Sequence, residues 1–440
     1  MEILQCTMAA VATQYLGHED HRISGNQLHL NSVHKLRMIS YDNDWSLETM
    51  QAVLLCEYYS RFRGRDKDAY QSSPLFAFLY QKAVACQITS ELPTTTSASE
   101  YERWQRWVEV ETRRRLLAAC FLLDVHCMRY FEQAPVSAVG LDYSAPRSLP
   151  IPLTSNSGEL WDTTSSAAWS RLYDPQSVHL TIKDAVSHGL TSADIEQASP
   201  FDASVLLAAY ALQFKRRQSP TRIDLVQDAS TIEITEIDVA NLFAHSAVGN
   251  TYLALHQTPL HVVLSVSGDS WVFNKKVLRQ ASFVQQQGQL ARWRDSGSAA
   301  VAAAFAARAL VAFLRLDSDG SCTTENTAPT SPNNLSCADI SDYWGIYVCA
   351  LICWAFGHVG RDAAQHARSS RSATVQWLLS AAKLQPSHVQ RLAGRRHAQG
   401  VVSLAREALE KEHFGGRSIL IADAVGVLRK LEDGDACKRF

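Results

Sequence analysis

One uninterrupted stretch, residues 100–133, constrains the fold of this 440-residue chain more than any other. It reads EYERWQRWVEVETRRRLLAACFLLDVHCMRYFEQ and contains neither glycine nor proline. Its apolar residues recur at helical spacing on two faces, marked by Trp104, Val108 and Leu122 and by Leu117, Phe121 and Met128. A helix with two apolar faces is buried on more than one side. The stretch therefore predicts the central helix of a large all-helical domain.

Charged residues interrupt both apolar faces of this helix. Glu111 and Arg115 fall on the first face, and Asp124 falls on the second. An unpaired buried charge costs several kcal/mol, roughly, so each of these side chains needs a partner. Glu111 and Arg115 form an i, i+4 pair in the favourable orientation. We therefore predict that Glu111, Arg115 and Asp124 tie the central helix to its neighbours.

The basic run Arg113, Arg114 and Arg115 has a second interpretation, which is phosphate recognition. Only one or two of the three can share a helix face, and Glu109 and Glu111 precede them. Lys plus Arg number 42 against 44 Asp plus Glu, a net charge of −2, so the chain has no global electrostatic attraction for nucleic acid or an anionic membrane. This balance favours the structural interpretation of the arginines.

The remainder of the chain predicts an all-α fold, a large multi-helix domain with long loops. The expected helices span residues 1–16, 24–39, 46–61, 74–89, 100–133, 202–217, 238–266 with a break at Pro259, 270–294, 298–316, 339–358, 362–383, 386–395, 401–413 and 418–432. Four prolines predict an extended segment over 134–152. The composition of residues 317–335 predicts a mobile low-complexity loop. We expect one domain over residues 1–440. A division of this domain into two helical lobes, 1–172 and 178–440, is left open.

The cysteines and the start of the chain indicate a reducing compartment. The ten cysteines are scattered, mostly in apolar helical contexts, and the first residues lack a basic region followed by an apolar run. Reduced thiols in the cytosol or nucleus are therefore expected. The uncharged run 343–360 is at the lower edge of membrane-spanning length and mixes polar aromatic residues, so a buried core helix is the better interpretation and no membrane is expected.

Metal and catalytic motifs are weak in this sequence. The pair His18 and His21 is one residue short of the metalloprotease spacing. The segment 317–320 begins like a calcium loop but lacks the later ligands. Cys349 and Cys353, with His358 following, do not supply the four ligands of a zinc site. Weak candidates for a catalytic centre are His245, His256 and His261. We expect no catalytic residue, no cofactor and no metal site.

The central stretch also carries a family resemblance. Residues 104–126, WQRWVEVETRRRLLAACFLLDVH, resemble the signature helix of the fungal-specific transcription factor domain, often called the middle homology region. The matching residues are Glu111, Arg113, Arg114, Arg115, Phe121 and Asp124. Three further stretches, 45–65, 148–169 and 414–434, resemble the same family in the same order. The resemblance extends over nearly the whole chain.

The resemblance implies a non-enzymatic regulatory domain of a nuclear transcription factor acting on RNA polymerase II transcription. Expected partners are proteins of the transcription machinery or a dimer mate, with a small-molecule effector as a further candidate. Such proteins usually carry an N-terminal zinc cluster or paired zinc fingers, whereas the first hundred residues here hold only Cys6, Cys56 and Cys86. Zinc and DNA binding are therefore expected only through a module missing from this chain.

Two features leave alternatives open. The chain opens inside a helical pattern, which predicts either a truncated N-terminus or a stand-alone regulator. Without a DNA reader, a helical enzyme of a biosynthetic cluster and a non-DNA-binding interaction scaffold also remain alternatives to a regulatory domain.

Overall fold

The computed structural model describes residues 2–16, 19–39, 41, 44–61, 72–88, 99–136, 151–153, 156–174, 180–182, 185–186, 189–214, 234–268, 271–272, 275–276, 280–316, 339–358, 370–411 and 419–433. Within these residues the fold is all-α, which confirms the predicted fold class. The described strands are two residues long and form two antiparallel pairs, β1 (Pro152–Leu153) with β2 (Leu180–Thr181) and β3 (Trp271–Val272) with β4 (Lys275–Lys276).

The helices follow the predicted order along the chain. They are α1 (Glu2–Ala12), the 3₁₀ helix η1 (Thr13–Tyr15), α2 (Glu19–Arg37), α3 (Leu47–Arg61), α4 (Pro74–Ile88), α5 (Glu100–Phe131), α6 (Ser157–Trp161), α7 (Ser166–Leu172), α9 (Ser192–Gln197), α10 (Pro200–Leu212), α11 (Ile234–Leu242), α12 (Ala247–His256), α13 (Leu260–Val266), α14 (Gln280–Arg294), α15 (Gly297–Leu314), α16 (Ile340–Gly357), α17 (Arg371–Lys383), the 3₁₀ helices η5 (Pro386–Arg391) and η6 (Arg395–Gly400), α18 (Val401–Lys411) and α19 (Ile419–Glu432).

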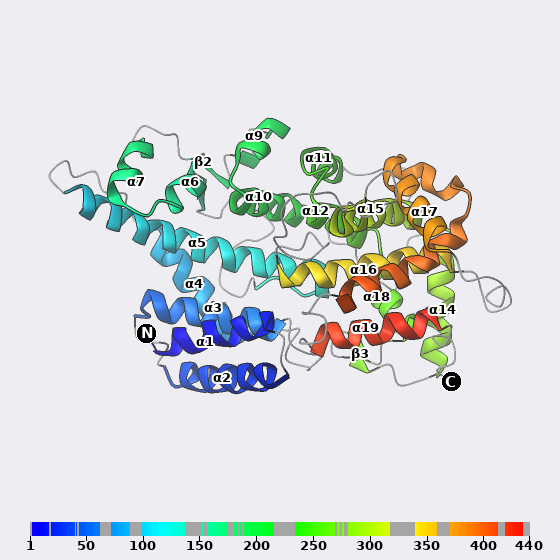
Figure 1. The fold of residues 1–440 in the computed structure, drawn as a ribbon, viewed down its shortest axis with the longest axis horizontal. Helices are drawn as coiled ribbons and strands as arrows, with labels where there is room; N and C mark the ends of the chain where they lie inside the picture. The colour runs from blue at the N-terminus through cyan, green and yellow to red at the C-terminus, as the bar shows by residue number, and fades with distance from the viewer. Residues whose placement is uncertain are drawn as a thin grey trace.

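Helix α5 runs through the middle of the molecule, as the sequence predicts. Figure 1 shows α5 and α16 between an upper row that includes α10, α12 and α15 and a lower group with α1 to α3 and α19. Helix α5 packs against α3 and α4 on one side and against α10 and α12 on the other. It is therefore buried on two faces over much of its length.

The two ends of α5 are defined by local chemistry. Ser99 accepts a hydrogen bond from the Glu102 N–H at 3.3 Å, and the Ser99 N–H donates to Glu102 Oε2 at 2.8 Å. This reciprocal capping box satisfies two donors at the helix start. At the other end Glu132 adopts a left-handed conformation, with φ 52°, which terminates the helix.

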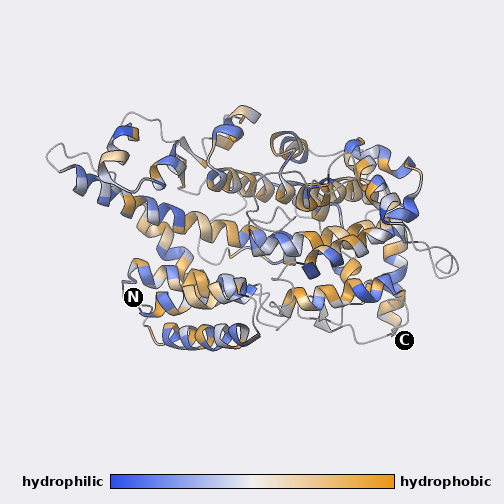
Figure 2. Ribbon diagram, viewed as in Figure 1, coloured by the Kyte–Doolittle hydropathy of each residue, from blue (hydrophilic) through white to orange (hydrophobic). Residues whose placement is uncertain are grey.

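Helices α12, α15 and α16 form the centre of the hydrophobic core. Alanines dominate α15 and let it pack closely against α12, α16 and α17. Figure 2 shows apolar residues concentrated along α15 and α16. Helix α15 is long and apolar enough to cross a membrane by length and composition alone, but a buried core helix passes the same test and most of α15 is buried.

The core is continuous between the two proposed lobes. Leu117 and Phe121 of α5 belong to the same cluster of buried apolar residues as Phe305 of α15 and Trp344 of α16. Whether 1–172 and 178–440 fold as separate units stays a prediction.

The structure corrects the predicted helix over 238–258. It contains two helices, α11 and α12, because Ser246 caps a new helix by accepting a hydrogen bond from the Gly249 N–H at 3.0 Å. The Asn250 amide donates to the carbonyl oxygens of Ala244 and Ser246, both at 2.9 Å, and holds the intervening turn.

Other boundaries also differ from the prediction. Helix α2 begins at Glu19 rather than Ser24. The predicted helical start of 270–294 is wrong at β3 and β4, and in β3 the aromatic Trp271 and the β-branched Val272 favour extended backbone. The predicted helix 386–395 is a 3₁₀ helix that begins at a proline. Several predicted features lie outside the described residues: most of the loop 317–335, most of the proline-rich segment 134–152, residues 215–217 and residues 414–418.

Candidate functional site

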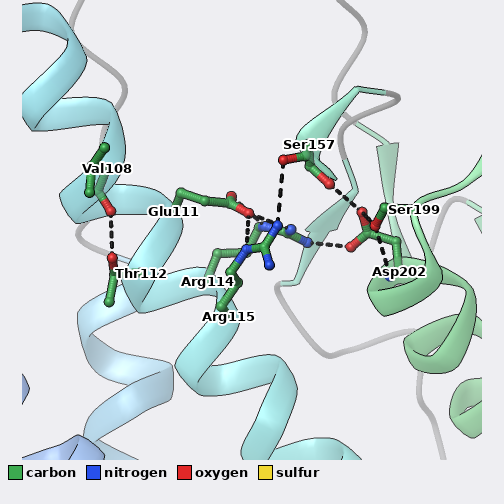
Figure 3. A network of polar contacts seen from close by, with 8 residues as sticks. All are labelled: Val108, Glu111, Thr112, Arg114, Arg115, Ser157, Ser199 and Asp202. Atoms are coloured by element: carbon green, nitrogen blue, oxygen red, sulfur yellow. Dashed lines mark hydrogen bonds and ion pairs between the residues drawn. The ribbon is translucent and has the colours of Figure 1, made fainter. Parts of the chain in front are cut away.

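The most elaborate polar cluster in the described residues lies where α5, α6 and α10 meet (Figure 3). We call it the Arg114 network. It comprises Glu111, Arg114 and Arg115 of α5, Ser157 of α6, and Asp202 of α10 with its cap Ser199. Three elements that are far apart in the sequence are thereby joined through charged and polar side chains.

Arg114 is the centre of this network. Its Nε donates to Glu111 Oε2 at 2.7 Å, and its Nη2 donates to Glu111 Oε1 at 2.6 Å, which makes a bidentate pair. Its Nη1 donates to Asp202 Oδ1 at 2.7 Å across 88 positions of sequence. The guanidinium is only 2% exposed, so these bonds form away from water. One arginine thus joins α5 to α10 and forms ion pairs with two buried carboxylates.

The capping of α10 positions Asp202. The Asp202 N–H donates to Ser199 Oγ at 3.1 Å, and the Ser199 hydroxyl donates back to Asp202 Oδ2 at 2.8 Å. The buried hydroxyl of Ser157 also donates to Asp202 Oδ2. Both carboxylate oxygens of Asp202 therefore have partners, and the first turn of α10 is fixed against α5 and α6.

Arg115 completes the rim of the network. Its Nε donates to Glu111 Oε1 at 2.8 Å, and its guanidinium lies 4.3 Å from the ring centroid of Trp161 and 5.1 Å from that of Phe201. A cation over an aromatic face is held by the quadrupole of the ring. With 20% of its side chain exposed, Arg115 lies at the edge of the network, outside the buried centre.

The electrostatics of Arg114 follow from this geometry. Burial alone disfavours the charged guanidinium and would lower its pKa. The hydrogen bonds and charges of Glu111 and Asp202 outweigh that effect and raise the pKa of Arg114 above its ordinary value. Arg114 is therefore a permanent cation.

Asp124 lies further along α5 in a different environment, which we call the Asp124 site. Its carboxylate accepts hydrogen bonds from the Val136 N–H, at 3.1 Å to Oδ1 and 3.3 Å to Oδ2. Burial raises the pKa of Asp124 to about 7, against the opposing effects of this N–H and of the Arg61 charge. Asp124 thus has weaker compensation than either carboxylate of the Arg114 network.

The Arg61 charge near Asp124 is itself held by another acid. Arg61 of α3 pairs with Glu57 of the same helix, both nearly fully buried. Glu57 also accepts from Ser73, from the N–H at 3.1 Å and from the hydroxyl at 2.8 Å. The pair therefore fixes the end of α3 to the start of α4, beside α5.

The structure places the six signature residues in four environments. Glu111, Arg114 and Arg115 come together in the Arg114 network, and Asp124 lies in its own site. Phe121 is fully buried in the core. Arg113 points to the surface and pairs with Glu109 at 2.6 Å. Of the three arginines, Arg114 forms the ion pair to a distant helix, whereas Arg115 contacts α6 and α10 through the rings of Trp161 and Phe201.

Sequence reasoning missed the partners Asp202 and Ser157. One local signal was present for Asp202, because Ser199 followed three residues later by an acid is a helix-capping pattern. Nothing local distinguishes Ser157, whose partner lies 45 positions away. Long-range pairing of this kind requires the fold.

The histidine and cysteine candidates have varied environments. Buried His256 pairs with Glu236 of α11 at 2.9 Å, whereas His245 is exposed on the turn after α11. His261 is half-buried on α13, where its backbone N–H bonds to Glu132. Buried Cys349 and Cys353 have raised thiol pKa values, because burial disfavours the thiolate. Among the described residues no group of three His, Cys, Asp or Glu is arranged to hold a metal ion. The segment 317–320 lies outside the described residues.

The fold and its site define a class: an all-α domain whose principal polar cluster joins helices through paired charges. The fungal specific transcription factor domain family matches residues 2–235 of the 440. The chain belongs to this family, as predicted, and the match includes all six signature residues of α5. Comparisons with curated proteins and with solved structures found no match. The family is one of regulatory domains rather than enzymes, and its members are in general nuclear.

Proposed function

We propose that this chain is the regulatory domain of a fungal transcription factor that controls RNA polymerase II transcription in the nucleus. In this proposal it acts without catalysis, and a DNA-reading module outside these residues brings it to promoters. The observation that carries the proposal is the family match over residues 2–235, which includes α5 and its signature charges. Zinc belongs to the proposal only as part of that separate module.

The physical features of the Arg114 network support a regulatory rather than a chemical role for these charges. Arg114, Glu111 and Asp202 are mutually paired and at most 4% exposed. Charges already satisfied by one another hold helices in register and are not free to act on a substrate. A regulator that switches needs two helix packings of different affinity for a partner protein or effector. The junction of α5, α6 and α10 is where we place the contact that such a change would break.

Two alternatives, an enzyme and an interaction scaffold, make different predictions. An enzyme requires acid–base groups that converge on a pocket, and the sequence candidates were His245, His256 and His261. His256 is buried against Glu236 and His245 is exposed, so nothing in their described contacts favours this function. A scaffold would bind partners but leave transcription unchanged when it is placed at a promoter.

A tethered reporter assay tests the proposal. The full 440-residue chain is fused to a heterologous DNA-binding module, and transcription is compared with that of the module alone. We expect a change of several-fold in either direction, because a regulatory domain held at a promoter recruits or blocks the transcription machinery. Unchanged transcription from a nuclear, folded fusion would contradict the proposal and favour the scaffold.

Two variants control for folding in this assay. Arg113→Ala removes an exposed pair and is expected to leave the reporter signal unchanged. Arg114→Ala removes the buried link to α10 and is expected to abolish the signal through loss of the native packing. Equal signals from the two variants would show that the effect on transcription does not depend on the Arg114 network.

A further inference from the structure

Residues 363–406 are the longest stretch of this chain without an acidic residue. Asp and Glu make up 44 of the 440 residues, one in ten, yet none lies in this stretch. The same stretch contains seven Lys and Arg. The whole chain has a net charge of −2, so this region is strongly basic within a nearly neutral protein. It also lies outside residues 2–235, which the family match covers.

The exposed side chains of this region are basic or neutral. The structure describes residues 370–406 of it, and the exposed residues there are four Arg or Lys, one His, three Ser, two Gln and one Ala. None of the large apolar side chains that are exposed in the described residues lies here. A protein interface has an apolar centre, whereas a surface for a polyanion needs positive charge and hydrogen-bond donors. This region has the second composition.

The 3₁₀ geometry of η5 directs its basic residues towards solvent. In a 3₁₀ helix, side chains three positions apart lie on the same side. Val389 is fully buried and Leu392 packs on the same core, so these two residues mark the inner side of η5, which contacts α15. His388 and Arg391 are exposed and share an outer side, about 6 Å apart along the axis. The outer side of η5 therefore presents a cation beside an imidazole.

A tight turn connects η5 to η6. Gly394 has a left-handed φ of 73°, and the His397 N–H donates to the Gly394 carbonyl oxygen at 2.8 Å. Arg391 precedes this turn and Arg396 follows it, and both are exposed. Figure 1 shows α17 and the orange segment after it at the end of the molecule away from the first turns of α5. The two arginines thus lie on one short segment at an edge of the molecule.

Other arginines hold this segment against the core. Arg308 of α15 donates to the carbonyl oxygens of Ala382 at 2.9 Å and Leu384 at 3.0 Å, at the end of α17. Arg395 of η6 donates from Nε to the Phe356 carbonyl oxygen at 2.7 Å, and its guanidinium lies 4.0 Å from the Phe356 ring centroid. Arg308 and Arg395 therefore fix the segment through contacts that do not involve its exposed cations.

Three exposed cations of the segment, Lys383, Arg391 and Arg396, form no ion pair with another residue that the structure describes. We call them the basic surface. In contrast, Arg371 and Arg406 of the same region pair with glutamates of α18. Like charges on one short segment repel one another, and an anion that covers them removes this repulsion.

We propose that the basic surface binds the phosphodiester backbone of duplex DNA without reading its sequence. Lys and Arg supply the charge, and the exposed Ser387 and His388 lie between them as hydrogen-bonding groups for phosphate oxygens. Interfaces with DNA are polar and strongly positive, which favours DNA over an acidic protein as the partner. The choice of DNA over RNA rests on the proposed function. The contact is separate from the zinc-containing module that the family resemblance implies.

Fluorescence anisotropy of a labelled duplex of about 20 base pairs, titrated with the full chain, tests the proposal. Three phosphate contacts predict a slope of about −2.7 for the logarithm of the binding constant against that of the salt concentration. We expect a dissociation constant of about 5 µM at about 50 mM KCl and about 100 µM at about 150 mM. Two duplexes of unrelated sequence should bind equally, because the backbone carries no sequence information.

Arg391→Ala with Arg396→Ala is expected to reduce the slope to about −0.9 and to weaken binding by more than about 10-fold at about 50 mM KCl. Arg37→Ala with Arg106→Ala is the matched control. It removes the same charge from exposed arginines of α2 and α5, and the slope should stay unchanged. Matching unfolding temperatures establish that each variant is folded.

A charge-preserving pair separates electrostatics from packing. Arg391→Lys with Arg396→Lys keeps both charges and should keep the wild-type slope, because phosphate accepts lysine as a point charge. Lys383→Ala alone should lower the magnitude of the slope by about 0.9. These two variants decide the question if the double alanine variant fails to fold.

Each contrary result overturns the proposal. No binding up to about 200 µM at about 50 mM KCl, or binding that salt does not weaken, would exclude a backbone contact. A preference above about 10-fold for one sequence would require contacts to bases. An equal loss in the Arg37 and Arg106 control would attribute binding to net charge. Poly-glutamate of equal total charge that competes as well as DNA would assign the surface to an acidic protein. The assay needs no reporter, so its failure and that of the proposed function are observed separately.

Discussion

Helix α5 carries buried charge in two places that are compensated to different degrees. In the Arg114 network one guanidinium is shared by Glu111 and Asp202, and two serine hydroxyls also donate hydrogen bonds to Asp202. At the Asp124 site a carboxylate accepts from one backbone N–H, and the cation that acts on it, Arg61, is already paired with Glu57. Burial is alike, because Arg114 is 2% exposed and Asp124 is 1% exposed.

Two equally buried ionisable groups of α5 therefore differ in how they respond to pH. The pKa of Arg114 is raised, so its charge persists at any pH at which the protein is folded. The pKa of Asp124 is raised to about 7 and therefore falls in the physiological range. Arg114 therefore keeps its charge, whereas Asp124 changes its charge near neutrality.

Arg114→Ala is expected to have the largest effect on stability. The substitution leaves Glu111 and Asp202 as buried carboxylates without their shared cation. Removing one partner of a buried ion pair costs about 3–5 kcal/mol in the free energy of unfolding. Urea denaturation followed by circular dichroism measures this loss. A loss below about 1 kcal/mol would show that water enters and replaces the guanidinium, against the geometry of the Arg114 network.

A second substitution separates charge from packing in this result. Asp202→Asn in the wild-type chain weakens the pair with Arg114 and destabilises the fold. In the Arg114→Ala background the same change removes a carboxylate charge that has lost its cation, and it is expected to stabilise the fold. This reversal of sign is a coupling that a double-mutant cycle measures. Destabilisation in both backgrounds would attribute the effect of Arg114 to packing alone.

Much of the fold was predictable from the sequence, because helices are specified by local periodicity and capping. The bounds of α5 were predicted to within two residues at its end, since its charges and apolar faces are continuous. The division between α11 and α12 was missed because Ser246 is a cap without a glycine or proline beside it. Helix α2 was the least predictable in orientation, because the contact of Gly25 with Thr13 is tertiary.

Asp124→Asn is expected to remove a pH dependence of stability. With a pKa of about 7 when folded and 3.8 when unfolded, Asp124 binds more protons in the folded state between these values. Stability contributed by the neutral carboxyl is therefore present at low pH and is lost as the pH rises to about 7. Between about pH 5 and pH 7.5 wild type should lose about 2–3 kcal/mol relative to the Asn variant. Urea titrations at both pH values measure the difference.

The pH experiment has an internal control. Burial also raises the pKa of Glu132 to about 7, against hydrogen bonds from the backbone of Leu260 and His261. Glu132 is the same in both proteins, so its contribution cancels when the variant is subtracted from wild type. Parallel pH profiles for wild type and Asp124→Asn would show that Asp124 stays ionised and that Arg61 compensates it fully.

The candidate site was predictable only in part. Sequence placed Glu111 and Arg115 together on one face, and they do form a pair. It could not identify Arg114 as the link to α10, because the identity of Asp202 as a partner depends on how α10 crosses α5. The same holds for Asp124, whose donor Val136 follows the end of the helix. Local spacing specifies pairs within a helix, whereas pairs between helices require the packing.

Arg115→Ala is expected to change stability less than Arg114→Ala or Asp124→Asn. Arg115 keeps one hydrogen bond to Glu111 and a cation–π contact with Trp161, but part of its side chain reaches solvent. Its loss leaves Glu111 paired with Arg114, so neither buried carboxylate of the network loses its ion pair with Arg114. A decrease of about 1–2 kcal/mol in the free energy of unfolding is expected. Arg113→Ala, which removes the pair with Glu109 at the surface, should cost at most about 0.5 kcal/mol. An Arg115→Ala loss as large as that of Arg114→Ala would show that Arg115 stabilises the network as much as Arg114 does. A loss as small as that of Arg113→Ala would show that the Trp161 contact contributes nothing to stability.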